Sequence, residues 1–517
     1  MRRARPLLAL CLCALLALSG CGEPEPLPSP TDTPEPTPGP TAQPVARFSL
    51  GWDPAAPIHP ITGESQVNQE LTGLVYQGLY ELDNTFTPRP VLAQSAAVSE
   101  DGLTWTFTLK SGAVFSDGTP LTAAHGAASL NAARAAPLYA PRLAGVTGAA
   151  AGEEGALIVT LSAPNGNLPA LLDVPIVLEQ PEGAAPLGTG YYHYEQAGEQ
   201  LLLRANPHNP SASALPYDAI PLTPASDAAS RIAAFDSGEV SCVTTDFTSP
   251  YALGYSSSYE ATDFPTTALL YVGFRAGGGM CRSPLVRRAF SMALDREEAV
   301  RLDLSGHGDG ACLPISPLSG EYGQTAADTL AYDLEQAAAL LEEAGYAKRE
   351  DGLLYSGRAP AEVALLVNSD NDVRQAIANR LARALEELGV TVTVTRLPWS
   401  GYTAALEKGD FDLYLGEVRL TGDFDPTALL AGELNYGGFY SGELSARLAQ
   451  WKAARGDGRA QAAVALWEQF AQDAPIAPVC FKRGSLLMRW GMAANLTPTR
   501  ANPYYQMDQW ITTGYGR

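Results

Sequence analysis

The stretch of sequence that says most about the fold is Val75–Ala123, which reads VYQGLYELDNTFTPRPVLAQSAAVSEDGLTWTFTLKSGAVFSDGTPLTA. Within this stretch, apolar and polar residues alternate over Leu103–Lys110, which predicts a half-buried strand. Ser116-Asp117-Gly118 marks a turn further along. At its start, the leucines and the valine of Glu70–Tyr80 recur with helical spacing. The stretch therefore indicates a structure that mixes helices and strands.

Predicted strands and helices alternate regularly between residues 362 and 417. The strands are expected at Glu362–Asn368, Thr391–Leu397 and Asp412–Glu417, and the helices at Val373–Leu388 and Tyr402–Lys408. Such alternation is typical of βαβ units with right-handed crossovers. Other helices are expected at Leu121–Arg134, Ser226–Ser237, Pro284–Asp295, Asp333–Ala344 and Ala460–Asp473, and other strands at Ala46–Trp52, Val240–Thr245, Ala268–Phe274 and Ile476–Phe481. The fold class is therefore expected to be α/β.

Short motifs follow the opening stretch in a definite order. They are LGTGYY at Leu187–Tyr192, Ala205-Asn206-Pro207, VRRAFSMALDR at Val286–Arg296, and Tyr332-Asp333 with the segment Ala337–Gly345. In this order they resemble solute-binding protein family 5, the extracytoplasmic receptors of ABC importers for peptides, nickel and some sugars. One departure is Ala124-His125, where the family usually has Asp-Val followed by an aromatic residue.

The resemblance implies a two-lobed periplasmic-binding-protein type II fold of cluster C, with the ligand enclosed between the lobes. Lobe 1 would comprise residues 46–270 and 479–517, with an extra subdomain at 76–180. Lobe 2 would comprise residues 271–478 and would contain the predicted βαβ units.

The N-terminus has the layout of a secretory signal at residues 1–20. Three arginines lie within the first five residues, and a short apolar run over Leu7–Ala17 follows them. The next residues, Leu18-Ser19-Gly20-Cys21, resemble the bacterial lipobox, which implies that Cys21 carries lipid and becomes the mature N-terminus. The alternative is an ordinary signal peptide with an incidental cysteine.

Residues 21–45 are expected to form a tether. Nine of the 23 residues of Gly22–Pro44 are prolines, and this composition favours an extended chain that spans roughly 70 Å. The formal net charge of the whole chain is −22, and loss of the signal makes it more negative. This charge argues against nucleic acid as a partner, since nucleic-acid binding needs clustered lysine and arginine.

Cysteine usage is compatible with an exported protein. Beyond Cys21, the chain keeps Cys242, Cys281, Cys312 and Cys480, none of them in a C-x-x-C pair. A disulfide between Cys281 and Cys312 is predicted, because it would bracket the helix between them, and disulfides persist outside the cytoplasm. Cys242 and Cys480 lie in apolar stretches and are expected to be buried thiols.

A search for catalytic motifs is negative, so no enzyme activity, cofactor or metal is predicted. None of the five histidines is followed by glutamate, and neither a Walker A pattern nor a dinucleotide fingerprint occurs. His307-Gly-Asp309 is interpreted as a polar turn.

Ligand contacts are predicted mainly from the resemblance. Peptide-binding members carry an aspartate that pairs with the ligand's α-ammonium, and Asp423 occupies that place. Leu420 stands where the family has tryptophan, however, and the alternative is that Asp423 and Asp425 cap a turn before a helix at Thr427. Arg419 could meet a ligand carboxylate through its planar fork or could form a surface salt bridge.

Four weaker candidates are aromatic or amide side chains. Trp399 matches a cleft tryptophan of oligopeptide binders, and Trp52 follows the first strand, whose loop borders the cleft in the family. Both could instead be core residues. Asn435 and Tyr436 lie in a loop expected near the cleft face of lobe 2.

The function predicted is that of a monomeric substrate-binding lipoprotein, anchored to the bacterial cell membrane through Cys21. It would capture a small solute, with a peptide favoured, by hinge closure and deliver it to the permease of an ABC importer. The alternatives are a nickel-chelate or other small-solute receptor on the same fold, and an extracytoplasmic sensor or hydrolase.

Overall fold

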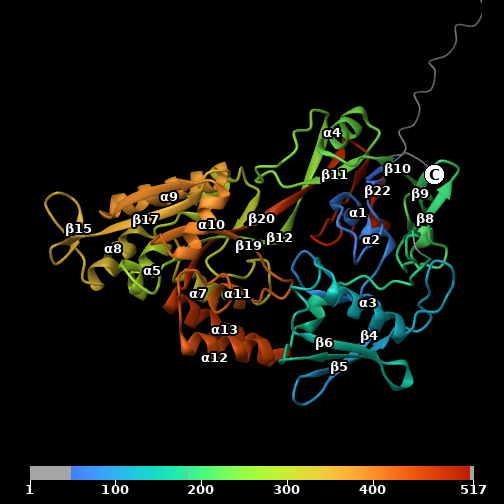
Figure 1. Ribbon diagram of the computed structural model, residues 1–517, viewed down its shortest axis with the longest axis horizontal. Coiled ribbons are helices and arrows are strands. Elements are labelled where there is room, and N and C mark those ends of the chain that lie inside the picture. Colours follow the sequence, from blue (N-terminus) through green and yellow to red (C-terminus); the bar gives the residue numbers. More distant parts are fainter. Residues whose placement is uncertain (1–47, 182, 513–517) are drawn as a thin grey trace, which may run out of the picture. The chain divides into compact units, whose positions relative to one another are not determined.

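The computed structural model describes residues 48–181 and 183–512, in which helices pack around several β-sheets (Figure 1). The predicted signal 1–20, the lipidation site Cys21 and the tether 21–45 lie outside these residues. Within the described ranges, no helix combines the length and the apolarity that a membrane crossing requires.

The largest sheet contains the predicted βαβ units. Near one edge of this sheet, strand β17 (Glu362–Asn368) lies between β18 (Thr391–Leu397) and β19 (Leu413–Arg419) and is parallel to both. The connections are α9 (Asp372–Leu388) and α10 (Trp399–Lys408). Helix α9 ends at Gly389, whose φ of 97° only glycine adopts readily, and this explains the sharp stop read from the sequence. The predicted alternation is confirmed.

This sheet has a hydrophobic core on each face. Along β12 (Tyr259–Phe274), Leu270 and Val272 pack on the α9 side, whereas Leu269 and Tyr271 pack on the opposite side. Successive side chains of a strand point to opposite faces, so one strand serves both cores. The opposite side is covered by α12 (Gly442–Ala453) and α13 (Gly456–Asp473). Residues 269–481 build these two cores together with Phe86, and we call residues 271–478 the second lobe.

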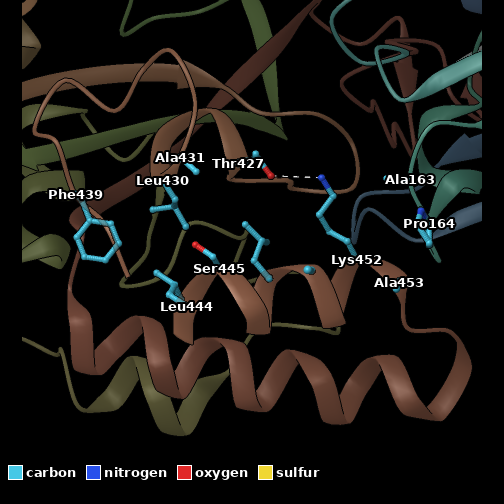
Figure 2. A pocket seen from close by; sticks show the side chains of 12 residues that line it. Ala163, Pro164, Thr427, Leu430, Ala431, Phe439, Leu444, Ser445, Lys452 and Ala453 are labelled. Atoms are coloured by element: carbon cyan, nitrogen blue, oxygen red, sulfur yellow. Dashed lines mark hydrogen bonds between the residues drawn. The ribbon is translucent and has the colours of Figure 1, made fainter. Parts of the chain in front are cut away.

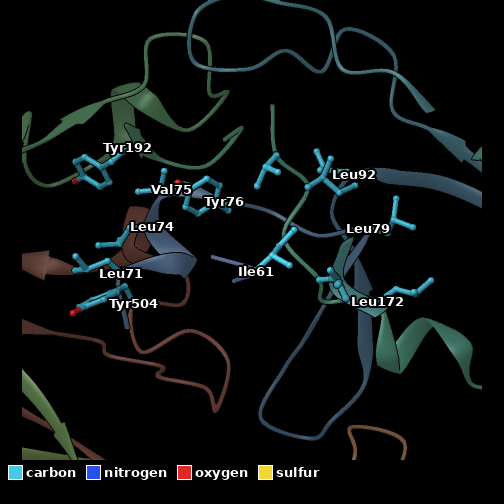
Figure 3. Packing of buried hydrophobic residues seen from close by; sticks show 14 of the residues in the cluster. Ile61, Leu71, Leu74, Val75, Tyr76, Leu79, Leu92, Leu172, Tyr192 and Tyr504 are labelled. Atoms are coloured by element: carbon cyan, nitrogen blue, oxygen red, sulfur yellow. The ribbon is translucent and has the colours of Figure 1, made fainter. Parts of the chain in front are cut away.

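The first lobe is built around a separate core contributed by residues 48–222 and 486–510. Figure 3 shows part of this core, in which Leu74 and Val75 pack with Tyr192 and Tyr504. One four-stranded sheet consists of β1 (Leu50–Trp52), β10 (Ala219–Pro224), β9 (Gln200–Ala205) and β8 (Tyr192–Ala197). A second consists of β4 (Ala93–Val98), β5 (Thr104–Leu109), β7 (Leu157–Leu161) and β6 (Val146–Ala151), covered by α3 (Ala123–Ala135).

Two long antiparallel strands, β12 and β20 (Ile476–Arg489), join the lobes. Their pairing runs from Tyr259 opposite Arg489 to Gly273 opposite Ile476, with an irregularity between Pro265 and Leu269. The sequence predicted only the apolar part of each strand, Ala268–Phe274 in β12 and Ile476–Phe481 in β20. The remaining halves carry polar residues such as Asp263 and Lys482, which find partners from other elements in the fold.

The helix predicted over Glu70–Tyr80 is wrong beyond Val75. Two short helices, α1 (Gln66–Glu70) and α2 (Thr72–Val75), are followed by extended chain from Tyr76. The cause is a tertiary contact, because the carbonyl of Val75 accepts the N–H of Gly190 (2.9 Å) instead of an N–H four residues ahead. Gly190 fits so closely that a Cβ there would lie 2.5 Å from the Val75 carbonyl carbon.

The other predicted helices are confirmed with small shifts of their ends. They are α3, α4 (Ala228–Ser237), α5 (Pro284–Met292), α8 (Leu334–Glu343) and α13. Short elements complete the lobes: α6 (Arg296–Glu298), α7 (Gln324–Asp328), α11 (Thr427–Leu430), β2 (Tyr80–Leu82), β3 (Pro88–Pro90), β11 (Cys242–Thr245), β13 (Gly308–Gly310), β14 (Ala347–Lys348), β15 (Leu354–Ser356), β16 (Ala359–Pro360), β21 (Ala493–Ala494) and β22 (Ile511–Thr512).

The predicted Cys281–Cys312 disulfide is not present, because both residues are free thiols in the structure. The physical reason is their placement on opposite faces of the large sheet. Cys281 belongs to the core on the α9 side, whereas Cys312 packs against the core on the α13 side. Cys242 and Cys480 are buried thiols, as predicted, and burial raises the pKa of both.

Candidate ligand-binding site

The candidate site begins at one edge of the large sheet. Because β17, β18 and β19 are parallel, their last residues Asn368, Leu397 and Arg419 lie along the same edge. In open α/β sheets, ligands bind outside the carboxyl ends of the strands. The predicted residues Trp399, Arg419 and Asp423 all follow or end these strands.

Asp423 lies where the second lobe touches the first. Its side chain is buried, with 6% of the residue exposed. The Thr421 hydroxyl donates to one carboxylate oxygen (2.6 Å), and the Asn165 amide, from the first lobe, donates to the other (3.0 Å). Burial raises the pKa of Asp423 and the nearby Asp425 raises it further, while these two hydrogen bonds and the charge of Lys452 act in the opposite direction.

Asp425 has the capping role that the sequence left open for both acids. Its carboxylate accepts the N–H of Thr427 (2.9 Å) at the start of α11 and pairs with the ammonium of Lys452. Asp423 makes no such contact with α11 among the described residues. The two acids therefore differ in role, although they are only two residues apart.

Arg419 is exposed at the end of β19 and makes no ion pair with any described residue. It acts electrostatically on Arg500, which comes from the C-terminal part of the first lobe. Burial lowers the pKa of Arg500; the charges of Arg142 and Arg419 lower it further, and Asp173 opposes them. Asp173 is itself paired with Arg142 (2.5 Å), so its carboxylate is not free for Arg500 alone. Sequence reasoning missed Arg142 and Arg500, because they lie far apart in the chain and in no motif.

The two tryptophans occupy different environments. Trp399 is 56% exposed at the first turn of α10, where its ring stacks on Tyr402 and its backbone N–H donates to Asp370 (2.9 Å). It is thus a free aromatic surface at the sheet edge. Trp52 ends β1 and packs, half-buried, against the core of the first lobe.

Asn435 and Tyr436 shape a loop of the second lobe. The Asn435 amide donates to the carbonyls of Leu430 (3.3 Å) and Phe439 (2.8 Å), and its oxygen accepts the N–H of Phe439 (3.0 Å). The ring of Tyr436 meets that of Tyr414 edge-on, against the core on the α13 side. All hydrogen-bonding groups of the Asn435 side chain thus hold the loop in place.

A charge network that was not predicted bridges the lobes at the long strands. Lys482 of β20 is 5% exposed and pairs with Asp246, just after β11 (2.7 Å), and with Glu417 of β19 (3.4 Å). Arg374 of α9 completes the network on Glu417 (2.9 Å). The only sequence signal for it was a pair of basic residues, Lys482-Arg483, directly after the apolar segment Ile476–Phe481.

A cavity of about 330 Å³ lies between α11 and α12 (Figure 2). Its walls are mainly apolar, with Leu430 and Leu444 among them, and Lys452 and Thr427 form its polar end. Ala163 and Pro164 of the first lobe close one side. The residues described here hold no cluster of three or more histidine, cysteine, aspartate or glutamate side chains suited to a metal ion.

Two lobes joined by a pair of long strands, with polar groups gathered at a sheet edge, define a solute-binding protein of the type II class. The profile described as bacterial extracellular solute-binding proteins, family 5 Middle, matches residues 87–438. The chain therefore belongs to this family, and it is a solute-binding protein of the ABC-importer type. Members of this family act outside the cytoplasm.

Individual relatives agree with this assignment. The glutathione-binding protein GsiB of Salmonella typhimurium is 25% identical over 393 residues, which cover 71% of this chain and 74% of GsiB. Among solved structures, the unliganded open form of the murein tripeptide-binding protein MppA is similar with a TM-score of 0.75 at 18% identity, covering 91% of this chain and 98% of MppA.

The structure of NikA from Brucella suis in complex with Fe(III)-EDTA is also similar, with a TM-score of 0.67 at 18% identity, covering 90% of this chain and 99% of NikA. These likenesses confirm the predicted fold class. The similar proteins are binding proteins rather than enzymes.

Proposed function

We propose that this protein captures a short peptide between its lobes and delivers it to a membrane permease. The observation that carries the proposal is the buried carboxylate of Asp423, held at the contact between the lobes beside the sheet edge. A buried carboxylate with a raised pKa gains strongly from a cationic partner, such as the α-ammonium of a peptide.

The arginines supply the opposite end of the proposed site. Arg419 and Arg500 make no ion pairs within the described part of the chain, and Arg142 leaves a buried Nε without a hydrogen-bond acceptor. A carboxylate is the natural partner of such guanidinium groups. A ligand with both an ammonium and a carboxylate, as a free peptide has, would satisfy both ends, and Trp399 offers a ring for side-chain stacking.

Relatives support a peptide ligand. GsiB binds glutathione, which is a tripeptide, MppA binds a murein tripeptide, and AppA from Bacillus subtilis holds a nonapeptide. We place the lobe boundaries at residues 270/271 and 478/479, inside β12 and β20, with residues 76–180 as the extra subdomain of the first lobe. Ligand contacts from both lobes would then favour the closed form by bending these two strands.

The test is calorimetry with trialanine and with its N-acetylated and C-amidated forms. Asp423→Asn should weaken binding of trialanine by about 2–5 kcal/mol, since a buried charge pair is lost. The matched control is Asp410→Asn, which removes an exposed acid of the same lobe. The proposal fails if Asp423→Asn binds trialanine as the wild type does, or if acetylation has no effect.

A small polycarboxylate, including a metal chelate, is the second candidate ligand. The positive charges of Arg142, Arg419 and Arg500 favour it, since Arg142 and Arg419 both act on Arg500, and NikA holds Fe(III)-EDTA. Titration with Ni(II)-EDTA and metal analysis of the purified protein decide between the two candidates.

We further propose that the protein acts as a monomer without turnover of its ligand and that lipid on Cys21 holds it at the membrane. The support for the anchor is the lipobox-like segment ending at Cys21 together with the proline-rich residues after it. Cys21→Ala should release the protein from membranes. Recovery of intact peptide after incubation tests the absence of hydrolysis.

A further inference from the structure

Residues 162–167, which connect β7 to the short helix Leu168–Leu171, form a loop of the first lobe that reaches the second lobe. We call these residues the latch loop. The Asn165 amide donates to Asp423 (3.0 Å), and the N–H of Gly166 donates to the carbonyl of Lys452 (2.6 Å). The Asn165 oxygen accepts the N–H of Asn167 (2.8 Å), which orients the amide toward Asp423.

The contact between latch loop and second lobe is sterically close. A Cβ on Gly166 would lie 1.8 Å from the carbonyl oxygen of Ala454, so only glycine fits there. Nearby, a Cβ on Gly422 would lie 2.5 Å from the carbonyl oxygen of Ala170. The rings of Phe86 and Phe424 also meet edge-on across the lobes, 4.7 Å apart. The two lobes thus fit closely together at this junction.

Both carboxylate oxygens of Asp423, at the centre of this junction, have protein partners. Asp423 accepts one hydrogen bond on each oxygen, from Thr421 and from Asn165, and is almost fully buried. A peptide ammonium could reach the carboxylate only if the latch loop withdrew. The amide of Asn165 therefore occupies the position that an incoming cationic group would need.

We infer that Asn165 is a built-in competitor of the ligand and that its hydrogen bond to Asp423 sets the affinity of the site. This inference rests on the proposed role of Asp423 as the ammonium partner. The Asn165 amide is neutral, whereas an ammonium would add the attraction of two opposite charges to its hydrogen bond with Asp423, so the ligand displaces Asn165. Each binding event then costs one hydrogen bond already made, which keeps the affinity moderate and release possible.

The withdrawal of the latch loop has a second consequence. Ala163 and Pro164 close one side of the cavity between α11 and α12, and Lys452 lies at its polar end. The loop movement that frees Asp423 would therefore also widen this cavity.

The test uses a mixture of tripeptides with free termini. Retained peptides are identified by mass spectrometry after gel filtration, and the affinity of the most retained one is measured by calorimetry. Asn165→Ala should tighten binding about tenfold, because the competing hydrogen bond to a charged group is absent. Gly166→Ala should also tighten binding, since its Cβ forces the latch loop off Ala454 while the Asn165 amide is kept.

Asn167→Ala is the matched control, because it changes an asparagine of the same loop whose side chain makes no contact with the second lobe among the described residues. It should bind as the wild type does. An affinity in Asn165→Ala that is unchanged or weaker overturns the inference, since it means that Asn165 stays in place or supports the ligand.

The two proposals fail in different ways. If Asp423→Asn binds the same tripeptide as tightly as the wild type, the proposed ammonium site is wrong. If Asp423→Asn weakens binding but Asn165→Ala does not tighten it, only the competition is wrong. In an Asp423→Ala background, Asn165→Ala should have no effect, because the hydrogen bond that it removes no longer exists.

Discussion

The two charged regions at the junction of the lobes differ in how completely the protein satisfies them. The acidic region, Asp423 and Asp425, is closed by protein partners: Thr421, Asn165, Thr427 and Lys452. In the basic region, Asp173 pairs with Arg142, whereas Arg419 and Arg500 form no ion pair with any described residue. The acidic side chains are thus engaged by protein groups, and two of the three arginines are not. A ligand must displace a protein partner to reach a carboxylate that is already hydrogen-bonded. A charged side chain without an ion-pair partner attracts an oppositely charged ligand directly.

The buried ion pairs of Lys482 contrast most strongly with Arg419 and Arg500, which form no ion pair with described residues. Lys482→Met should lower the free energy of unfolding by about 3–5 kcal/mol, because Asp246 and Glu417 lose a buried partner. Urea denaturation measures the effect. Lys408→Met removes an exposed lysine and should change the stability by less than about 0.5 kcal/mol. Equal stability of the two variants would show that the network contributes little.

Arg500→Met should weaken ligand binding without lowering the stability of the fold, unlike Lys482→Met. Removal of Arg500 relieves the repulsion by Arg142 and Arg419, so the unfolding free energy is not expected to fall. Trialanine binding should weaken by about 1.5–3 kcal/mol, the worth of a hydrogen bond to a charged group. C-amidated trialanine should bind both proteins alike. A large loss of stability without loss of affinity would make Arg500 a structural residue.

The pH dependence of folding gives a further test of Asp423. The pKa of Asp423 is raised above its usual value of 3.8, so the ligand-free fold binds more protons than the unfolded chain between that value and the raised pKa. The contribution of Asp423 to stability therefore falls as the pH rises through this window.

Ligand binding has the reverse dependence, because an ammonium requires the ionised carboxylate. Affinity for C-amidated trialanine should fall by about 1.4 kcal/mol for each pH unit below the raised pKa of Asp423. Calorimetry over a pH series measures this slope. In Asp423→Asn the slope should vanish; a slope that persists there belongs to another group.

The smallest expected effect distinguishes the two acids. Asp425→Ala should lower the free energy of unfolding by about 1 kcal/mol, as the loss of a cap does, with little change in trialanine affinity. A thermal melt measures the change in stability, and a calorimetric titration with trialanine measures the change in affinity. If Asp425→Ala weakens binding as much as Asp423→Asn, the division of roles between the two acids is wrong.

Sequence reasoning was most successful where structure is local. The strands and helices of residues 362–417 follow from periodicity and from caps such as Gly389, which act within one turn of the chain. It was wrong at Glu70–Tyr80, where Gly190, more than a hundred residues away, takes the carbonyl of Val75. It was wrong also at Cys281 and Cys312, because the separation along the chain does not reveal that a sheet lies between them.

The candidate site shows the same division. The resemblance pointed to Asp423, Arg419 was predicted from its place beside that loop, and the parallel strands place both at one edge of the sheet. Asn165, Arg142 and Arg500 were missed, because nothing in their neighbourhood distinguishes them from other polar residues. Only the tertiary structure shows that Asp425, rather than Asp423, caps α11, since both residues precede that helix in the sequence.

The amino-acid sequence alone was sufficient for the α/β class, the family and the alternation of elements in the second lobe, because motifs and periodicity are properties of neighbouring residues. The tertiary structure decided which acid faces the other lobe, which cations lack partners and which loop lies over Asp423. Those are properties of residues that lie up to 358 positions apart, from Arg142 to Arg500. Hydrogen bonds and charges act over a few ångströms in space, and only the folded chain sets those distances.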